Sequence, residues 1–123
     1  MTVKHKVLII DDDKVIHKMI KSALDIEGIP CLHAYNGKEG LALYQEHNPA
    51  MVILDIKMPV MDGIEFLKTL KPNTEALRSI VVCSGCQEPE IKNFCLGFGV
   101  KSFLDKPFRV TEVMSLASSY AKK

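Results

Sequence analysis

The sequence predicts an α/β fold in which one five-stranded parallel sheet is covered by helices on both faces, a doubly wound arrangement. Short apolar runs rich in β-branched residues recur along the chain, as expected of strands that are buried on both faces. Between them lie segments of about ten residues whose apolar positions follow helical spacing. This regular alternation of strand and helix implies parallel pairing through right-handed crossovers.

The first predicted strand covers residues 7–10, which form an unbroken apolar run. Residues 14–25 follow, with apolar side chains on one helical face and lysines on the other, so they predict an amphipathic helix. Gly28 and Pro30 end this helix. A weaker strand is predicted at residues 31–34.

A turn at Asn36-Gly37 opens the second predicted helix, and Asn48-Pro49 ends it, because the residue before a proline is disfavoured in helical conformation. Residues 51–54 form the second strongly apolar run and predict another buried strand, which Asp55 closes. The segment 57–63 contains a proline and a glycine and is expected to be a loop.

The third predicted helix carries Ile64, Leu67 and Leu70 on one face and ends before Pro72. The rest of the chain repeats the alternation of strand and helix. Its predicted elements are a buried strand, a short helix, a short strand and a final helix, at residues 80–83, 90–98, 103–104 and 111–122.

Length and composition predict a single domain over residues 1–123, since domains usually have roughly 100–150 residues. The formal net charge of +1 gives no electrostatic reason to expect nucleic acid or a membrane as direct partner. No apolar run approaches the roughly 20 residues of a membrane-spanning helix. The first residues also lack the pattern of a signal peptide. We therefore expect a cytoplasmic protein without membrane insertion.

Polar residues follow four of the predicted strands at their carboxyl ends. They are Asp11-Asp12-Asp13, Asp55, Ser84 and Asp105-Lys106-Pro107. In an open parallel sheet, ligands bind outside the carboxyl ends of the strands. We therefore expect several carboxylates, one hydroxyl and one ammonium group to meet at one edge of the sheet.

Such a group of side chains is suited to phosphoryl chemistry. Carboxylates about 4 Å apart repel each other by roughly 4 kcal/mol per pair at an effective dielectric constant near 20. The cluster therefore needs a protonated acid or a bound cation, and oxygen ligands favour a hard cation such as Mg²⁺. A carboxylate beside Mg²⁺ and a lysine can act as a nucleophile toward phosphorus, and a hydroxyl can bind a phosphoryl oxygen. The residues predict a phosphoryl-accepting site.

The sequence resembles the receiver domains of response regulators from Lys6 to Tyr120. Four motifs carry the resemblance, in order and at receiver spacing: VLIIDDD at 7–13, VILD at 52–55 with MP and MDG at 58–59 and 61–63, IVVCSG at 80–85, and FLDKPF at 103–108. The resemblance is to single-domain, chemotaxis-type receivers. It implies a flavodoxin-like strand order 2-1-3-4-5 with five helices, and no output domain is expected after Lys123.

The resemblance also implies a role for each matching residue. Asp55 would be phosphorylated, and Ser84 and Lys106 would complete the catalytic set by binding phosphoryl oxygens. Asp11 and Asp12 would hold Mg²⁺, which Mn²⁺ can replace, together with Asp55. The backbone carbonyl of Lys57 would be a further metal ligand, and Phe103 would be a switch residue that moves with Ser84. The resemblance also implies a cis peptide bond between Lys106 and Pro107.

The partners implied by the resemblance are proteins of two-component signalling. A sensor histidine kinase or a histidine phosphotransfer protein would donate the phosphoryl group from a phosphohistidine. A downstream target protein would bind the surface formed by the last two helices and the strand between them. The chain would be a signalling phosphoacceptor that catalyses only its own phosphorylation and dephosphorylation.

Two other function classes remain open at this point. Cys83 and Cys86 have the C-x-x-C spacing of thiol redox proteins, although Cys83 falls in an apolar strand, where a thiol is buried and inert. An aspartate-nucleophile phosphatase would use related chemistry. The sequence resembles those enzymes less well, because Lys57 stands where their second acid protonates the leaving group, two residues after Asp55.

Two groups of residues are expected to be structural. Asp13 is expected to cap the first helix, since an aspartate there accepts hydrogen bonds from the first turn. The four histidines share no metal-ligand spacing, and each is expected to be exposed on its own: His5, His17, His33 and His47.

Overall fold

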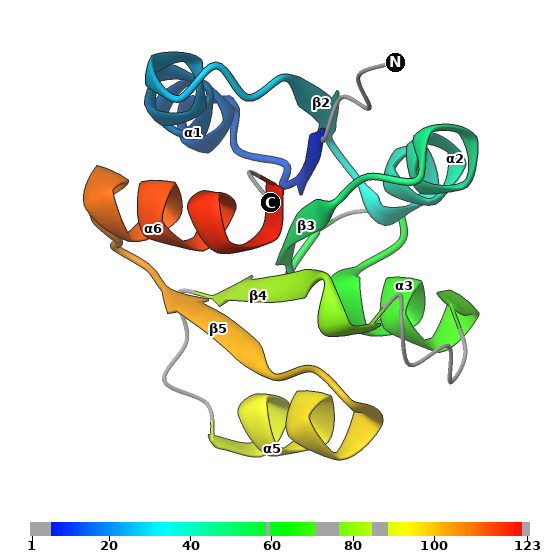
Figure 1. The fold of residues 1–123 in the computed structure, drawn as a ribbon. Coiled ribbons are helices and arrows are strands. Elements are labelled where there is room, and N and C mark those ends of the chain that lie inside the picture. Colours follow the sequence, from blue (N-terminus) through cyan, green and yellow to red (C-terminus); the bar gives the residue numbers. More distant parts are fainter. Residues whose placement is uncertain (1–5, 59, 71–76, 85–88, 122–123) are drawn as a thin grey trace.

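The computed structural model describes residues 6–58, 60–70, 77–84 and 89–121, with the side chains of Ser84 and Ala121 left aside. Strands and helices alternate along the chain (Figure 1). The strands are β1 Val7–Ile10, β2 Cys31–Ala34, β3 Met51–Asp55, β4 Ile80–Ser84 and β5 Ser102–Asp105. The helices are α1 Lys14–Ile26, α2 Gly37–His47, α3 Gly63–Leu70, α5 Pro89–Phe98 and α6 Val110–Ala121.

The five strands form one parallel sheet in the order β2-β1-β3-β4-β5, which confirms the predicted order. Ile10 at the end of β1 is level with Ala34 of β2 and Leu54 of β3. Farther along, Asp55 is level with Cys83 of β4. This register places the residues that follow each strand at a common edge of the sheet.

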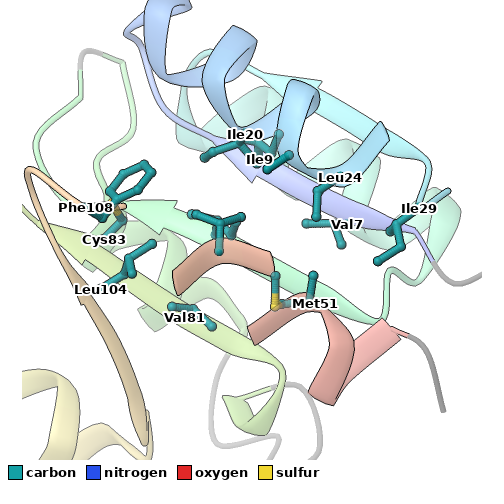
Figure 2. Packing of buried hydrophobic residues seen from close by; sticks show 14 residues of the cluster. Val7, Ile9, Ile20, Leu24, Ile29, Met51, Val81, Cys83, Leu104 and Phe108 are labelled. Atoms are coloured by element: carbon teal, nitrogen blue, oxygen red, sulfur yellow. The ribbon is translucent and has the colours of Figure 1, made fainter. Parts of the chain in front are cut away.

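Helices cover both faces of the sheet, as predicted, and divide the core into two layers. Alternate residues of a strand point to opposite faces. Val7 and Ile9 therefore pack with α1 and α6, in the layer that Figure 2 shows, whereas Leu8 and Ile10 face the opposite layer. The second layer contains buried side chains of α3 and α5 such as Phe66 and Cys95.

Hydrogen bonds from side chains begin two of the helices where the sequence predicts. Asp13 is the N-cap of α1, as expected, and its Oδ1 accepts from the backbone N–H of Val15 at 2.9 Å. Asn36 begins α2 in the same way, with its Oδ1 accepting from the N–H of Glu39 at 2.9 Å. These caps fix where the chain turns away from the carboxyl edge of the sheet.

A close contact at Gly63 brings the start of α3 against the end of β3. The N–H of Gly63 donates to the carbonyl of Ile56 at 2.9 Å. A Cβ at this position would lie 2.5 Å from the carbonyl oxygen of Asp55 and 2.8 Å from the Cα of Ile56. Only glycine permits this approach, which packs the loop after β3 beside the polar edge.

Several element ends differ from the predictions by one residue. β5 extends to Ser102 and Asp105 because they pair in register with Val81 and Ser84 of β4. The helix stop predicted at Pro72 lies outside the described residues. None of the helices formed by the described part of the chain has the length and apolar character needed to cross a membrane.

Candidate functional site

Three carboxylates meet at the carboxyl edge of the sheet, where the sequence predicts them. Asp11 directly follows β1, Asp12 is the next residue, and Asp55 ends β3. Each offers an oxygen atom within 4.8 Å of the others. Asp11 and Asp55 are 2% and 7% exposed, whereas Asp12 is open to solvent. The cluster thus has a buried floor and one exposed member.

Lys106 brings the positive charge to this cluster from the turn after β5. Its Nζ donates to Oδ2 of Asp11 at 2.9 Å and lies 3.4 Å from Oδ1 of Asp55. The peptide bond between Lys106 and Pro107 is cis, as the resemblance implies. The lysine therefore bridges two strand ends that the chain separates widely.

Backbone N–H groups hold both buried carboxylates in place. Oδ1 of Asp11 accepts from the N–H of Asp13 at 2.9 Å, and Oδ1 of Asp55 accepts from the N–H of Ile56 at 3.0 Å. Every buried side-chain nitrogen or oxygen among the described residues has a hydrogen-bond partner. Satisfied polar groups offset part of the cost of burying charge.

The electrostatics of the site remain unfavourable for two buried acids. Burial, and then the charge of Asp11, raise the pKa of Asp55 to about 6, although Lys106 opposes this shift. Burial disfavours the charged form of Lys106, but its hydrogen bond to Asp11 and the two carboxylate charges outweigh burial and raise its pKa. Three acids and one ammonium group leave the cluster with an excess of negative charge.

The donor set fits a hard divalent cation. All three groups offer carboxylate oxygens, and no described histidine or cysteine belongs to the cluster. One or two carboxylates together with water is the usual arrangement for Mg²⁺. A cation would also relieve the repulsion between Asp11 and Asp55. The predicted Mg²⁺ site is thus compatible with the residues that the structure brings together.

The other predicted site residues are Ser84, Lys57 and Phe103, which lie on strands of the same sheet or in the loop after one of them. Ser84 ends β4 and is level with Asp105 of β5, and its side chain is outside the description. Lys57 is exposed in the loop after β3. Phe103 is half-buried on β5, with the Nζ of Lys92 5.2 Å from its ring centroid.

The cysteines do not form a reactive pair in the described part of the chain. Cys83 is fully buried in β4, and burial raises its thiol pKa to about 12. The thiolate is the reactive form, so this thiol is inert at neutral pH. Cys86, its predicted redox partner, lies outside the described residues.

The expectation that each histidine is exposed on its own is wrong for the three described histidines. His33 and His47 are half-buried, and Nδ1 of His47 lies 3.2 Å from the Nζ of Lys6. The side chain of His17 is 3% exposed, and its Nδ1 lies 2.8 Å from Nδ1 of His33. Spacing could have revealed the burial, because His17 precedes the core residues Ile20 and Leu24 by three and seven positions. The contact with His33 depends on the pairing of β1 with β2. His5 lies outside the described residues.

Comparison with known proteins agrees with this geometry. The family model described as response regulator receiver domain matches residues 7–118. The chemotaxis protein CheY of Bacillus subtilis (strain 168) is 36% identical over 111 residues, which are 89% of this chain and 92% of that protein. The chain spans less than half the length of several other curated regulators that it matches.

Two solved structures show the same fold at substantial identity. The receiver domain of the Francisella response regulator 1452 has a TM-score of 0.84 and 33% identity, with 97% of this chain and 98% of that chain covered. The CheX–CheY–BeF₃–Mg²⁺ complex from Borrelia burgdorferi has a TM-score of 0.82 and 30% identity, with 94% and 87% covered.

Proposed function

Because the chain belongs to the response regulator receiver family, we propose that it accepts a phosphoryl group on Asp55 and acts as a phosphorylation-controlled switch. One observation carries the proposal. The buried Asp55 carboxylate lies within 4.8 Å of Asp11 and Asp12 oxygens, and its Oδ1 lies 3.4 Å from the Lys106 ammonium group. This arrangement combines a nucleophile, ligands for a divalent cation and a fixed positive charge.

The proposed reaction is transfer of a phosphoryl group from a phosphohistidine of a sensor kinase or a histidine phosphotransfer protein. A carboxylate oxygen of Asp55 forms a bond to phosphorus as the bond from phosphorus to the donor's imidazole nitrogen breaks. A pKa of about 6 leaves Asp55 mostly ionised at neutral pH, so it is available as the nucleophile. Lys106 stabilises negative charge on the transferred oxygens.

The donor set supports a role for Mg²⁺ in this transfer. Asp11, Asp12, Asp55 and the backbone carbonyl of Lys57 would hold the ion, and Mn²⁺ can replace it. When bound, the ion offsets charge on the phosphoryl oxygens. The ion would also add to the charge compensation that Lys106 already gives Asp11 and Asp55.

Phosphorylation would change the surface that a target protein binds. The added charge and acceptor oxygens would draw the hydroxyl of Ser84 and the ammonium group of Lys106 inward. Phe103 would follow Ser84 and alter the surface of α5, β5 and α6. The relative from Borrelia burgdorferi supports a partner-binding role, since its structure is a complex of CheY with CheX.

The proposal makes the chain a cytoplasmic signalling protein, with catalysis limited to its own phosphorylation and dephosphorylation. The two other classes have less support. The buried Cys83 thiol argues against redox chemistry. Lys57 stands where the phosphatases that the chain partly resembles carry their proton-donating acid.

Intact mass spectrometry tests the proposal directly. The protein is incubated with acetyl phosphate and Mg²⁺, beside Asp55→Asn and a sample with excess EDTA. We expect the mass of one phosphoryl group on the parent protein and none in the two other samples. Asp62→Asn is a matched control, because Asp62 caps α3 through its Oδ1 and asparagine caps equally well.

Two outcomes would contradict the proposal. A phosphoryl adduct that persists in Asp55→Asn would place the acceptor elsewhere. Absence of an adduct leads to a second measurement with beryllofluoride, a stable phosphoryl mimic. If beryllofluoride also produces no Mg²⁺-dependent change in the NMR spectrum, the site does not bind a phosphoryl group.

A further inference from the structure

A hydrogen-bonded pair of histidines lies directly behind the acidic cluster. His17 of α1 is buried, and its Nε2 lies 2.7 Å from the backbone carbonyl oxygen of Asp11. Its other nitrogen, Nδ1, lies 2.8 Å from Nδ1 of His33 on β2. The ring of Tyr35 packs against His17, with 4.4 Å between ring centroids. None of these three residues belongs to the site predicted from sequence.

The carbonyl of Asp11 determines the tautomers of both histidines. A carbonyl oxygen only accepts hydrogen bonds, so Nε2 of His17 carries the proton and donates. Nδ1 of a neutral His17 is then an acceptor, and His33 donates to it from Nδ1. Burial is the main cause that lowers the pKa of His33, which favours the neutral form of that ring. The hydrogen bonds thus run in one direction, from β2 through α1 to Asp11.

With the bond from His17, each polar atom of Asp11 has a hydrogen-bond partner. The N–H of Asp11 donates to the carbonyl of Ala34 at 3.1 Å. Its side chain binds the N–H of Asp13 through Oδ1 and Lys106 through Oδ2. The carbonyl oxygen is the remaining polar atom of Asp11, and His17 is the group that binds it. Without that bond, the peptide between Asp11 and Asp12 would lose its fixed orientation.

We infer that His17, oriented by His33, is a positioning residue that sets the orientation of Asp11 and Asp12 for cation binding. The inference rests on the proposed function of the acidic cluster. Residues that orient metal ligands through hydrogen bonds usually change metal affinity by about 10- to 100-fold when they are removed. His17 acts through the backbone of Asp11, so the expected effect is at the lower end of this range.

Two amide substitutions at position 17 separate the two hydrogen bonds of the ring. The amide nitrogen of glutamine takes a place similar to Nε2, so His17→Gln keeps a donor for the Asp11 carbonyl. Asparagine is shorter and reaches only the place of Nδ1, so His17→Asn keeps the contact with His33 and loses the bond to Asp11. The two variants differ by one methylene and are matched controls for each other.

Mg²⁺ titration of the metal-free protein, followed by NMR, measures the effect without any phosphodonor. We expect His17→Asn to bind Mg²⁺ ~10-fold more weakly than the parent protein, and His17→Gln within ~3-fold of it. The inference is overturned if both variants keep the parent affinity. It is also overturned if His17→Gln binds as weakly as His17→Asn, because loss of a buried ring would then explain both.

The tautomers of the parent protein give a test that needs no variant to fold. Nitrogen-15 NMR of the ring nitrogens distinguishes the two neutral tautomers. We expect the proton on Nε2 in His17 and on Nδ1 in His33. A proton on Nδ1 of neutral His17 overturns the inference, because Nε2 could then not donate to Asp11.

Failure of this inference and failure of the proposed function give different results. If Asp55→Asn abolishes phosphorylation while His17→Asn keeps normal Mg²⁺ affinity, the function stands and the positioning role is wrong. If the tautomers and the Mg²⁺ affinities agree but the parent protein accepts no phosphoryl group, the positioning role stands and the function is wrong.

Discussion

The two apolar layers and the carboxyl edge of the sheet follow opposite physical rules. In the layers, side chains such as Phe66 and Leu8 lose all contact with water and gain packing, so each contributes to stability. At the edge, Asp11 and Asp55 are buried as like charges, and the raised pKa of Asp55 records the cost. Packing in the two layers therefore supplies the stability that offsets the unfavourable burial of charge at the carboxyl edge, where the reactive groups lie.

The largest expected effect comes from opening a cavity in one apolar layer. Phe66→Ala should lower the free energy of unfolding by about 3–5 kcal/mol, because Phe66 is fully buried between the sheet and the helices. Phe94→Ala is the matched control. Phe94 is 40% exposed, so its truncation should cost less than about 1 kcal/mol. Urea unfolding measures both values, and equal losses would contradict the division into a packed layer and an open surface.

Removing a charge at the carboxyl edge should instead raise the free energy of unfolding. In metal-free protein at pH 7, Asp55→Asn should raise the free energy of unfolding by on the order of 2 kcal/mol. The folded pKa of about 6 lies above the ordinary value of 3.8, so ionisation of Asp55 destabilises the folded state. The gain should be full above the folded pKa, shrink as pH falls from about 6 toward 3.8, and vanish below 3.8, where Asp55 is protonated in both states.

Urea unfolding in EDTA checks the direction of the stability change and its pH dependence. The measurements run from about pH 4 to about pH 8, a range that spans the folded pKa of about 6 and reaches close to the unfolded value of 3.8. Asp62→Asn should leave stability nearly unchanged, since asparagine replaces aspartate well as a helix cap. A destabilised Asp55→Asn protein at pH 7 would show that the edge is not held at an energetic cost. The contrast with the apolar layers would then be lost.

The smallest expected effect concerns the loop that leads from the edge to α3. Val60 has φ 70°, a left-handed conformation that costs a β-branched residue roughly 1–3 kcal/mol, and its side chain is 73% exposed. Val60→Gly should stabilise the protein by about 1 kcal/mol, because relief of strain exceeds the entropy that glycine adds to the unfolded chain.

Asn48→Gly sharpens the prediction for Val60. Asn48 also has a positive φ, of 47°, but asparagine tolerates this conformation, so the substitution should change stability by less than about 0.5 kcal/mol. Thermal unfolding of both variants measures the difference. An equal response at the two positions would mean that the strain at Val60 is negligible, and that the loop, like the layers, is locally relaxed.

Features that depend on neighbours along the chain can be predicted from the order of the amino acids. The apolar run of Val7–Ile10 predicts a buried strand because residues of one strand alternate between two covered faces. Asp13 caps α1 because a cap bonds to N–H groups of the adjoining turn. The strand order was available only through resemblance to a family, since periodicity does not say which strands pair.

Contacts between groups that are distant in the sequence, and the effect of those contacts on their charge, depend on the folded sheet. Lys106 reaches Asp11 across 95 positions, and His17 meets His33 because β1 pairs with β2. The pKa of Asp55 depends on how deeply the carboxylate is buried and how near Asp11 lies, and neither quantity has a local signature. Spacing along the chain specifies the face of a helix or strand on which a side chain lies. The electrostatic potential at that side chain is a sum over charged and polar groups that come together only in the folded sheet.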